Sequence, residues 1–298
     1  MSVAAPTGRL CLATVSTDDF LPGTIVAIGS FLDTNRWFSG DIVIFHDADL
    51  SAGSIRTLSQ IWPDLQFRRI PQDLADAIAT LVHAVPRLAG RRARFHSLAT
   101  LALEDYAQVL FCDSDVLFQA SILPMFAASP GDVVAVGDAG FLRGLAWDRT
   151  SFAEVPPDAE GALYPTFNAG LMLFGSTALD GRAYRQALAM LAPERWAGIV
   201  ASHTDQLVLN RIFEHRVSLM SWRFNFLLFY ADLIAHKEPM PFDAIAVLHF
   251  NGSPKPWTAS RTGLVRNPLM FQAIAGWRAR ARTLLPDSIS TPWMTAKR

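Results

Sequence analysis

The chain has 298 residues, of which 51% are hydrophobic and 18% are charged, and its formal net charge is -1. This composition is that of a globular protein with one large or two small domains, and it excludes an intrinsically disordered chain. A charge so close to zero gives no general attraction for nucleic acid, and the body of the chain has no basic patch, so we expect no nucleic-acid partner.

The N-terminal residues 1–9 contain no apolar core of the kind that signal peptides have, and no later run reaches the roughly 18 apolar residues that cross a bilayer. We therefore expect a cytoplasmic protein. The two cysteines, Cys11 and Cys112, lie inside apolar runs. In a reducing compartment this placement predicts buried free thiols.

Apolar runs typical of strands alternate with segments of helical spacing along most of the chain. The expected strands are residues 10–15, 42–45, 65–70, 109–112, 133–136, 171–174 and 244–248. The expected helices are residues 23–32, 52–62, 93–104, 182–191 and 205–213. This order predicts an α/β fold with a mixed or mostly parallel sheet that is covered by helices on both faces.

Two segments rich in proline, glycine or charge, 139–166 and 231–242, interrupt this order and are expected to be irregular binding loops. The tail from residue 266 combines basic and aromatic side chains. They are Arg278, Arg280, Arg282, Lys297 and Arg298, with Phe271, Trp277 and Trp293. Two interpretations are open: a terminal helix that packs on the domain, or a segment that lies on an anionic membrane surface.

Two carboxylates follow the apolar run at 109–112. Because Asp113 and Asp115 are two positions apart, an extended backbone would point both the same way, at the sheet edge where α/β proteins bind ligands. Paired carboxylates are oxygen ligands suited to Mg²⁺ or Mn²⁺. The sequence Asp47-Ala-Asp49 has the same form. We interpret that copy as a solvated loop, because no second motif accompanies it.

A second motif, His249-Phe-Asn-Gly-Ser-Pro-Lys-Pro-Trp257, lies 134 residues after Asp115. An imidazole from His249 would favour Mn²⁺ over Mg²⁺ in a shared site. Lys255 would bind phosphate as a point charge, and Gly252 would permit close approach of the backbone. Trp257 is assigned to packing. The two motifs together predict a divalent cation on a diphosphate.

With both motifs in view, the chain resembles glycosyltransferase family 8, the group of retaining enzymes that includes glycogenin and the lipopolysaccharide galactosyltransferases. The resemblance covers about residues 10–257. It implies a GT-A fold over residues 1–262, with a Rossmann-like mixed, mostly parallel sheet, followed by a helical C-terminal extension at 263–298. It also implies that Asp113, Asp115 and His249 hold Mn²⁺, and that Asp113, Ser114, Gly252 and Lys255 meet the donor.

In this family the first strand ends in a polar turn that holds the nucleoside, and residues 14–23 occupy that place. The resemblance implies donor contacts from Thr14, Ser16, Thr17, Asp18 and Phe20. Phe20 stands where the family often has tyrosine, so stacking on uracil would persist without a hydroxyl contact.

Two middle motifs of the family also match, Asn168-Ala-Gly170 and Asp205-Gln206. The resemblance implies that Asn168, Asp205 and Gln206 act on the sugar being transferred. From the residues alone, Asn168 is equally explained as a turn residue and Asp205 as a helix N-cap.

The family usually has a basic residue, facing the donor phosphates, in the helix before the Asp113 strand. Counting back from Asp113 places Ser97 there. Arg94 lies three residues earlier on the same helical face, and we assign the phosphate contact to it. The aromatic cluster at 222–230 is expected to be core, with Asn225 as the one polar residue that faces the acceptor.

The resemblance implies a Mn²⁺-dependent enzyme, with Mg²⁺ as the alternative ion. It would move galactose or glucose from a UDP-sugar to a glycan or a lipid-linked saccharide, in the cytoplasm or at the inner face of the membrane. Two alternatives remain. A strand followed by Asp-x-Asp also resembles the nucleophile loop of haloacid-dehalogenase phosphatases, and a non-catalytic protein that binds nucleotide sugars would keep the same motifs.

Overall fold

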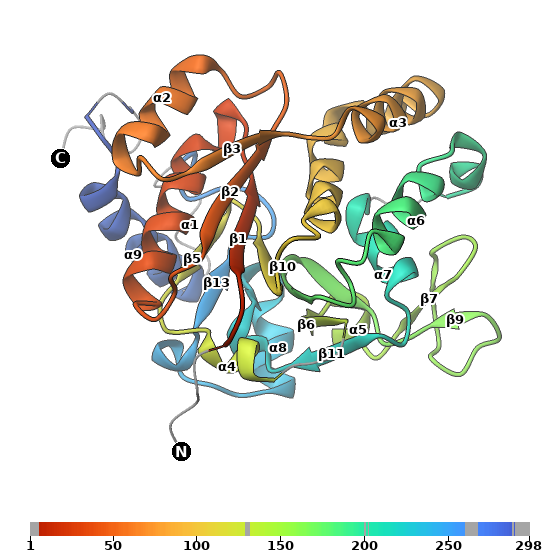
Figure 1. The fold of residues 1–298 in the computed structure, drawn as a ribbon. Coiled ribbons are helices and arrows are strands. Elements are labelled where there is room, and N and C mark those ends of the chain that lie inside the picture. The colour runs from red at the N-terminus through yellow and green to blue at the C-terminus, as the bar shows by residue number, and fades with distance from the viewer. Residues whose placement is uncertain are drawn as a thin grey trace.

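The structure, a computed structural model, describes residues 6–128, 132–199, 201, 203–259, 268–287 and 289. Its centre is a seven-stranded sheet with the order β11-β6-β10-β4-β1-β2-β3 (Figure 1). All neighbours pair in parallel except β10, which is antiparallel to β4 and β6. The predicted mixed, mostly parallel sheet is therefore confirmed. The strands are β1 Leu10–Val15, β2 Asp41–His46, β3 Gln66–Arg69, β4 Gln108–Cys112, β6 Val133–Gly137, β10 Phe167–Gly175 and β11 Val217–Met220.

Helices cover both faces of this sheet. They are α1 Leu21–Thr34, α2 Ala52–Ile61, α3 Gln72–Ala84, α4 Leu123–Ala127, α5 Ala139–Leu142, α6 Arg182–Met190, α7 Asp205–Ile212, α8 Ala231–Lys237, α9 Pro268–Leu284 and the long 3₁₀ helix η2 Pro86–Ala102. Alternate residues of β1 enter opposite cores. Leu10 and Leu12 pack in the core that contains α1 and α9, and Cys11 and Ala13 in the core that contains α3, α6 and α7. Burial on both faces explains why the strands are continuously apolar.

A small sheet with the order β12-β13-β5 lies beside the large one. Its strands are β5 Val116–Phe118, β12 Phe226–Leu227 and β13 Val247–His249. β5 begins directly after Asp115, and β13 pairs with it in antiparallel register, with His249 opposite Val116. The junction between the two sheets thus brings the two sequence motifs together.

Several predicted elements differ from the observed ones. The predicted helix at 93–104 is part of η2, which ends at Ala102. The segment 231–242 was expected to be irregular, but it begins with α8, whose seven residues are too few to show helical spacing. The segment 139–166 contains α5 and a second three-stranded sheet, formed by β7 Ala146–Asp148, β8 Glu154–Val155 and β9 Ala162–Leu163.

The C-terminal helix α9 packs on α1. Ala273, Ile274 and Trp277 are buried in the same core as α1, and Arg280 forms an ion pair with Asp33 of α1. This is the terminal helix of the first interpretation. The predicted boundary between residues 262 and 263 lies outside the described residues, as do Trp293, Lys297 and Arg298.

Cys11 and Cys112 are buried free thiols, as the sequence predicts. In the described part of the chain, no helix combines the length and the apolar character that crossing a bilayer requires.

Candidate active site

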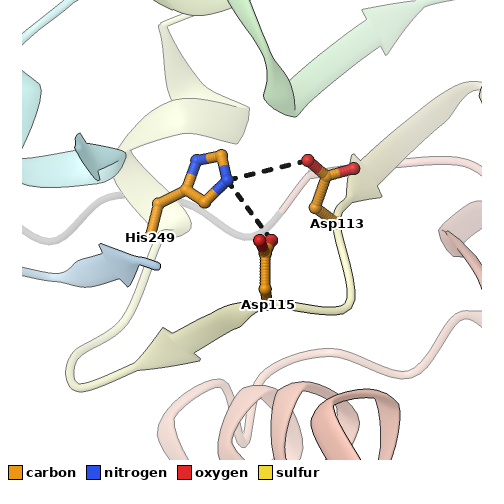
Figure 2. A group of neighbouring side chains, drawn as sticks. All are labelled: Asp113, Asp115 and His249. Atoms are coloured by element: carbon orange, nitrogen blue, oxygen red, sulfur yellow. Dashed lines mark ion pairs between the residues drawn. The ribbon is translucent and has the colours of Figure 1, made fainter. Parts of the chain in front are cut away.

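Three side chains from the two motifs meet where the large sheet passes into the small one (Figure 2). Asp113 follows β4, and its backbone N–H donates to the Gly170 carbonyl of β10 at 2.8 Å. Asp115 precedes β5, and its carbonyl accepts from the Phe250 N–H at 2.9 Å. This bond and the β5–β13 pairing place His249 against the two aspartates.

The His249 ring points toward both carboxylates. Its Nε2 lies 3.3 Å from Asp115 Oδ1 and 3.7 Å from Asp113 Oδ2. One ligand atom from each of the three residues lies within 4.8 Å of the other two. His249 and Asp115 are buried, whereas the Asp113 side chain is 43% exposed. The group is therefore compact and open to solvent on the Asp113 side.

One atom of this group indicates which kind of ion the site can bind. Asp115 Oδ1 is buried and accepts no hydrogen bond from the described residues; it faces His249 Nε2 at 3.3 Å, and Lys255 pairs with the other oxygen of this carboxylate. A buried carboxylate oxygen without a donor is unfavourable, and a cation at that oxygen would satisfy it. Two carboxylates and an imidazole form a donor set for a divalent cation, and the imidazole favours Mn²⁺. The residues present therefore fit Mn²⁺ and, with less preference, Mg²⁺.

The pKa values of the two aspartates are shifted in opposite directions. Partial burial and the neighbouring charge of Asp115 raise the pKa of Asp113, although 43% of its side chain is exposed. Burial alone would also raise the pKa of Asp115, but His249 and Lys255 together lower it well below its usual range. Lys255 Nζ forms an ion pair with Asp115 and donates to the Phe250 carbonyl at 2.8 Å. In this structure Lys255 therefore contacts Asp115, and its predicted role on the diphosphate stays a prediction.

Gly170 is the position of closest approach to the group. A Cβ built on it would lie 2.2 Å from His249 Cε1 and 2.9 Å from Asp113 Oδ2. The pairing of β10 with β6 shifts register between Asn168 and Leu173. Such a bulge redirects side chains beside functional sites. The family's Asn-x-Gly motif thus has a steric reason for its glycine in this chain.

Asp205 is the remaining acidic residue of the predicted site. It is the first residue of α7, and Thr204 occupies the N-cap position, so the capping interpretation of Asp205 is wrong. Its carboxylate accepts from Ser97 Oγ at 2.8 Å and from Thr204 Oγ1 at 2.9 Å. Burial raises its pKa although both hydroxyls oppose that shift. Its charge in turn raises the pKa of Asp113, which shows that the two carboxylates share one electrostatic environment.

Gln206 and Asn168 connect α7 to the metal-binding candidates. Asn168 Nδ2 donates to Gln206 Oε1 at 3.2 Å, and Gln206 Nε2 donates to Asp138 Oδ2 at 3.2 Å. Asn168 Oδ1 accepts from the Gly170 N–H at 3.0 Å. The structure thus brings together the predicted residues Asn168, Asp205 and Gln206 around the Asp113 group.

Three residues predicted to contact the donor have other partners. Ser114 Oγ donates to the Val15 carbonyl at 2.5 Å, Ser16 Oγ lies 2.7 Å from Thr24 Oγ1, and Thr14 Oγ1 lies 3.5 Å from Ser114 Oγ. Thr14, Ser16 and Ser114 are all buried. Their side chains connect the end of β1 to α1 and to the turn at Asp113. None of these three hydroxyls is therefore exposed to a nucleotide-sugar donor.

The rest of the predicted nucleoside turn reaches solvent. Thr17 and Phe20 are half-buried and Asp18 is exposed. Asp18 Oδ1 accepts from the Ser51 N–H at 2.9 Å, so part of this carboxylate anchors the start of α2. Phe20 packs edge-on against Trp257, with ring centroids 5.3 Å apart. This contact and the burial of Trp257 match the packing role predicted for the tryptophan.

Arg94 and Ser97 both lie on η2 but differ in their exposure to solvent. Arg94 is exposed, whereas Ser97 is buried and bonded to Asp205. The charge of Arg94 lowers the pKa of Asp205. The structure therefore relates both residues to Asp205, and the phosphate contact of Arg94 remains a prediction.

Sequence reasoning missed or misplaced three residues. Asn225 is completely buried, so it cannot face an acceptor as predicted, and it contacts His249 instead. Phe229 was expected in the core but is 65% exposed, and it lies beside Gly252, where an added Cβ would stand 3.1 Å from Phe229 Cδ2. Asp138 was not singled out, although it follows an apolar strand just as Asp113 does. That position was the signal that could have found it.

Solved structures place this arrangement in the GT-A class of glycosyltransferase folds. The galactosyltransferase LgtC, solved with donor and acceptor sugar analogues, is 20% identical, with a TM-score of 0.66 over 95% of this chain and 99% of that one. The glycosyltransferase GlyE of Streptococcus pneumoniae TIGR4 is 16% identical, with a TM-score of 0.55 over 98% of this chain and 66% of that one. At these identities the likeness concerns the fold.

A family profile described as glycosyl transferase family 8 matches residues 11–261. The chain belongs to this family, and the resemblance inferred from the two motifs is confirmed. A search of the curated proteins found none that matches the sequence.

Proposed function

We propose that this glycosyltransferase moves galactose or glucose, with retention of anomeric configuration, from a UDP-sugar to a glycan or lipid-linked saccharide. Its cofactor would be Mn²⁺, with Mg²⁺ as the alternative. One observation carries the proposal: Asp115 Oδ1 is buried, accepts no hydrogen bond from the described residues and faces His249 Nε2 at 3.3 Å. A site for a divalent cation next to a lysine is suited to a diphosphate leaving group.

Each residue has a role in this proposal. Asp113, Asp115 and His249 would hold the ion, which when bound would neutralise charge on the departing diphosphate. Lys255 would contribute a second positive charge to the same phosphates. Thr17, Asp18 and Phe20 would border the nucleoside.

Asp205 and Gln206 would orient the sugar. No described side chain stands out as a nucleophile separate from these groups. We therefore propose that the acceptor hydroxyl attacks from the face that the diphosphate leaves, with a phosphate oxygen taking the proton. Orientation of this kind acts on turnover more than on nucleotide affinity.

Phe229 supports a saccharide acceptor. Its ring is 65% exposed beside Gly252, and its backbone N–H is fixed by Asn251 Oδ1 at 3.1 Å. An exposed aromatic ring held in place beside a site offers a flat apolar face, and the C–H face of a sugar ring packs well on such a surface.

We also propose a cytoplasmic protein whose C-terminal segment touches the anionic inner face of the membrane. Phe271 of α9, 55% exposed, supports this contact, whereas the buried Trp277 contributes nothing to it. Co-sedimentation with vesicles of phosphatidylglycerol and phosphatidylcholine tests the contact. Binding that is equal for wild type and Phe271→Ala would remove Phe271 from it.

The experiment for the main proposal is release of UDP from a panel of UDP-sugars, with Mn²⁺ and with a chelator. We expect release from one sugar only, lost with the chelator and in Asp115→Asn. Asp47→Asn is the matched control, because it makes the same change in the other Asp-x-Asp sequence. Phosphate release from a simple phosphate ester without UDP release would favour the phosphatase. Metal-dependent UDP binding with no release would favour a non-catalytic binding protein.

A further inference from the structure

A continuous chain of hydrogen bonds connects Asp138, at the end of β6, with His249. Gln206 Nε2 donates to Asp138 Oδ2 at 3.2 Å, and Asn168 Nδ2 donates to Gln206 Oε1 at 3.2 Å. Asn225 Nδ2 donates to Asn168 Oδ1 at 2.9 Å, and Asn225 Oδ1 lies 3.0 Å from His249 Nδ1. Three amides thus separate a buried carboxylate from the imidazole.

The direction of every bond in this chain is fixed by groups with only one hydrogen-bonding role. A carboxylate only accepts, so Asp138 requires Gln206 to present its NH₂. Backbone N–H groups only donate. The Ala169 N–H donates to Gln206 Oε1 at 3.3 Å, and the Gly170 N–H donates to Asn168 Oδ1 at 3.0 Å. The orientations of Gln206 and Asn168 are therefore each determined twice, from independent sides.

The orientations of Gln206 and Asn168 determine which way the Asn225 amide points. Because Asn168 offers it an oxygen, Asn225 must present its NH₂ there and its Oδ1 to His249. Asn225 is completely buried, so water does not offer a competing partner. A neutral imidazole has one proton, and its position follows the partner of each nitrogen. A ring that keeps its proton on Nδ1 through Asn225 leaves the Nε2 lone pair for a cation between Asp113 and Asp115; without that cation, Nε2 faces two carboxylates that only accept.

We infer that Asp138 and Asn225 are positioning residues of the metal site, which act by fixing His249 as the Nδ1–H tautomer with Nε2 free to bind the ion. The inference rests on the proposed function insofar as the site takes a divalent cation. It also explains how residues assigned to the sugar and residues assigned to the metal act together, since Gln206 and Asn168 are links of the same chain. Outer partners of this kind change metal affinity about 10- to 100-fold.

The first test needs a variant only to assign signals. In the ¹⁵N-labelled protein saturated with Mg²⁺, long-range ¹H–¹⁵N spectra report which nitrogen of His249 is protonated. A His249→Gln sample assigns the signals. We expect a proton on Nδ1 and none on Nε2. A proton on Nε2 in the Mg²⁺-saturated wild type overturns the inference, whatever the variants do.

The second test uses Mn²⁺ titration followed by electron paramagnetic resonance. Asn225→Leu, similar in size but without an acceptor, is expected to lose about 10- to 100-fold in Mn²⁺ affinity. Asn225→Asp keeps the acceptor toward Nδ1 but faces Asn168 Oδ1 with its other oxygen, so it should restore only part of the affinity. Asn35→Leu is the matched control, because Asn35 is a buried amide that serves the backbone of Phe31 and Ile122.

The outcomes separate the inference from the proposed function. Asn225→Leu with wild-type Mn²⁺ affinity, or with a loss no larger than that of Asn35→Leu, overturns the inference. Should Asn225→Leu not fold, Asp138→Asn replaces it, since an NH₂ facing Gln206 Nε2 opposes the chain at its far end. An Nδ1–H tautomer with tight Mn²⁺ binding but no UDP release would sink the proposed reaction and leave the inference standing.

Discussion

The Gly170→Ala substitution tests the site through one added methyl group. Gly170 lies between the Asp113 carboxylate and the His249 ring, and a Cβ at this position would stand 2.2 Å from His249 Cε1 and 2.8 Å from Nδ1. Ordinary contact begins near 3.4 Å. The imidazole therefore has to move by about 1 Å, or β10 has to retreat from β4 by a similar amount.

The pairing of β10 with β4 sets the expected size of the Gly170→Ala effect. The backbone of β10 is held by its pairing with β4, where Leu171 faces Cys112, so the ring is the part that moves. Misplacement of a functional group by about 1 Å costs roughly 100-fold in activity. Adding one carbon to a packed site costs about 1 to 3 kcal/mol of unfolding free energy. We expect Mn²⁺ affinity and UDP release to fall by about 100-fold while the protein remains folded.

The assay combines Mn²⁺ titration, UDP release and denaturant unfolding on the same samples. Gly276→Ala is the control, because Gly276 lies within α9 and a Cβ there meets nothing within 4 Å. This control should keep full activity and gain slightly in stability. A Gly170→Ala protein that binds Mn²⁺ as wild type does would refute the steric account of the site.

Four further predictions concern Asp205, its partner Ser97, and Phe229. Asp205→Asn should lower turnover about 100-fold or more with UDP affinity unchanged; unaltered turnover would remove Asp205 from the site. Burial raises the pKa of Asp205 in the folded state, so ionisation of this carboxyl lowers the free energy of unfolding. The contribution of the protonated carboxyl to stability is present at low pH and is lost as pH rises from the ordinary carboxyl pKa through the raised one. Asp205→Asn should lack that part of the pH dependence of unfolding, and an identical profile would contradict the shift. The Ser97 hydroxyl favours the ionised form, so Ser97→Ala should raise the pKa of Asp205 further and move the acidic limb of kcat to higher pH; an unmoved limb would show that Asp205 does not titrate in turnover. Phe229→Ala should raise the KM for the acceptor about 10-fold and leave slow donor hydrolysis unchanged, since the ring offers area to the acceptor alone; an equal loss of both would place Phe229 in the donor site.

Local patterns in the sequence were sufficient for the central strands and for the identity of the metal-binding candidates. The runs at residues 10–15 and 109–112 match β1 and β4 closely, because strands buried on both faces are nearly continuous apolar runs. Elements with fewer buried residues were harder to predict. The sequence does not predict β11, none of whose four residues is buried. It predicts a helix over residues 93–104 without distinguishing 3₁₀ from α, because the buried Phe95, Leu98 and Leu101 are three apart, a spacing that both helix types allow.

The buried hydroxyls show a limit of motif reasoning. Thr14, Ser16 and Ser114 match or accompany family positions, yet each forms hydrogen bonds inside the protein. A motif fixes the position of a residue along the chain, but the direction of its side chain depends on the packing of α1 against β1. Conversely, the aromatic cluster at 222–230 contained the buried Asn225 and the exposed Phe229, and hydropathy could not tell them apart.

Apolar periodicity and the two motifs are local properties, so they suffice to predict the fold class, the family and the residue types of the site. The arrangement of those residues depends on contacts between distant segments of the chain. The antiparallel pairing of β5 with β13 brings His249 onto Asp115, and the bulge in β10 brings Gly170 and Asn168 against them. The direction of the amide chain from Asp138 to His249 depends on five residues from separate elements, so no local pattern contains it.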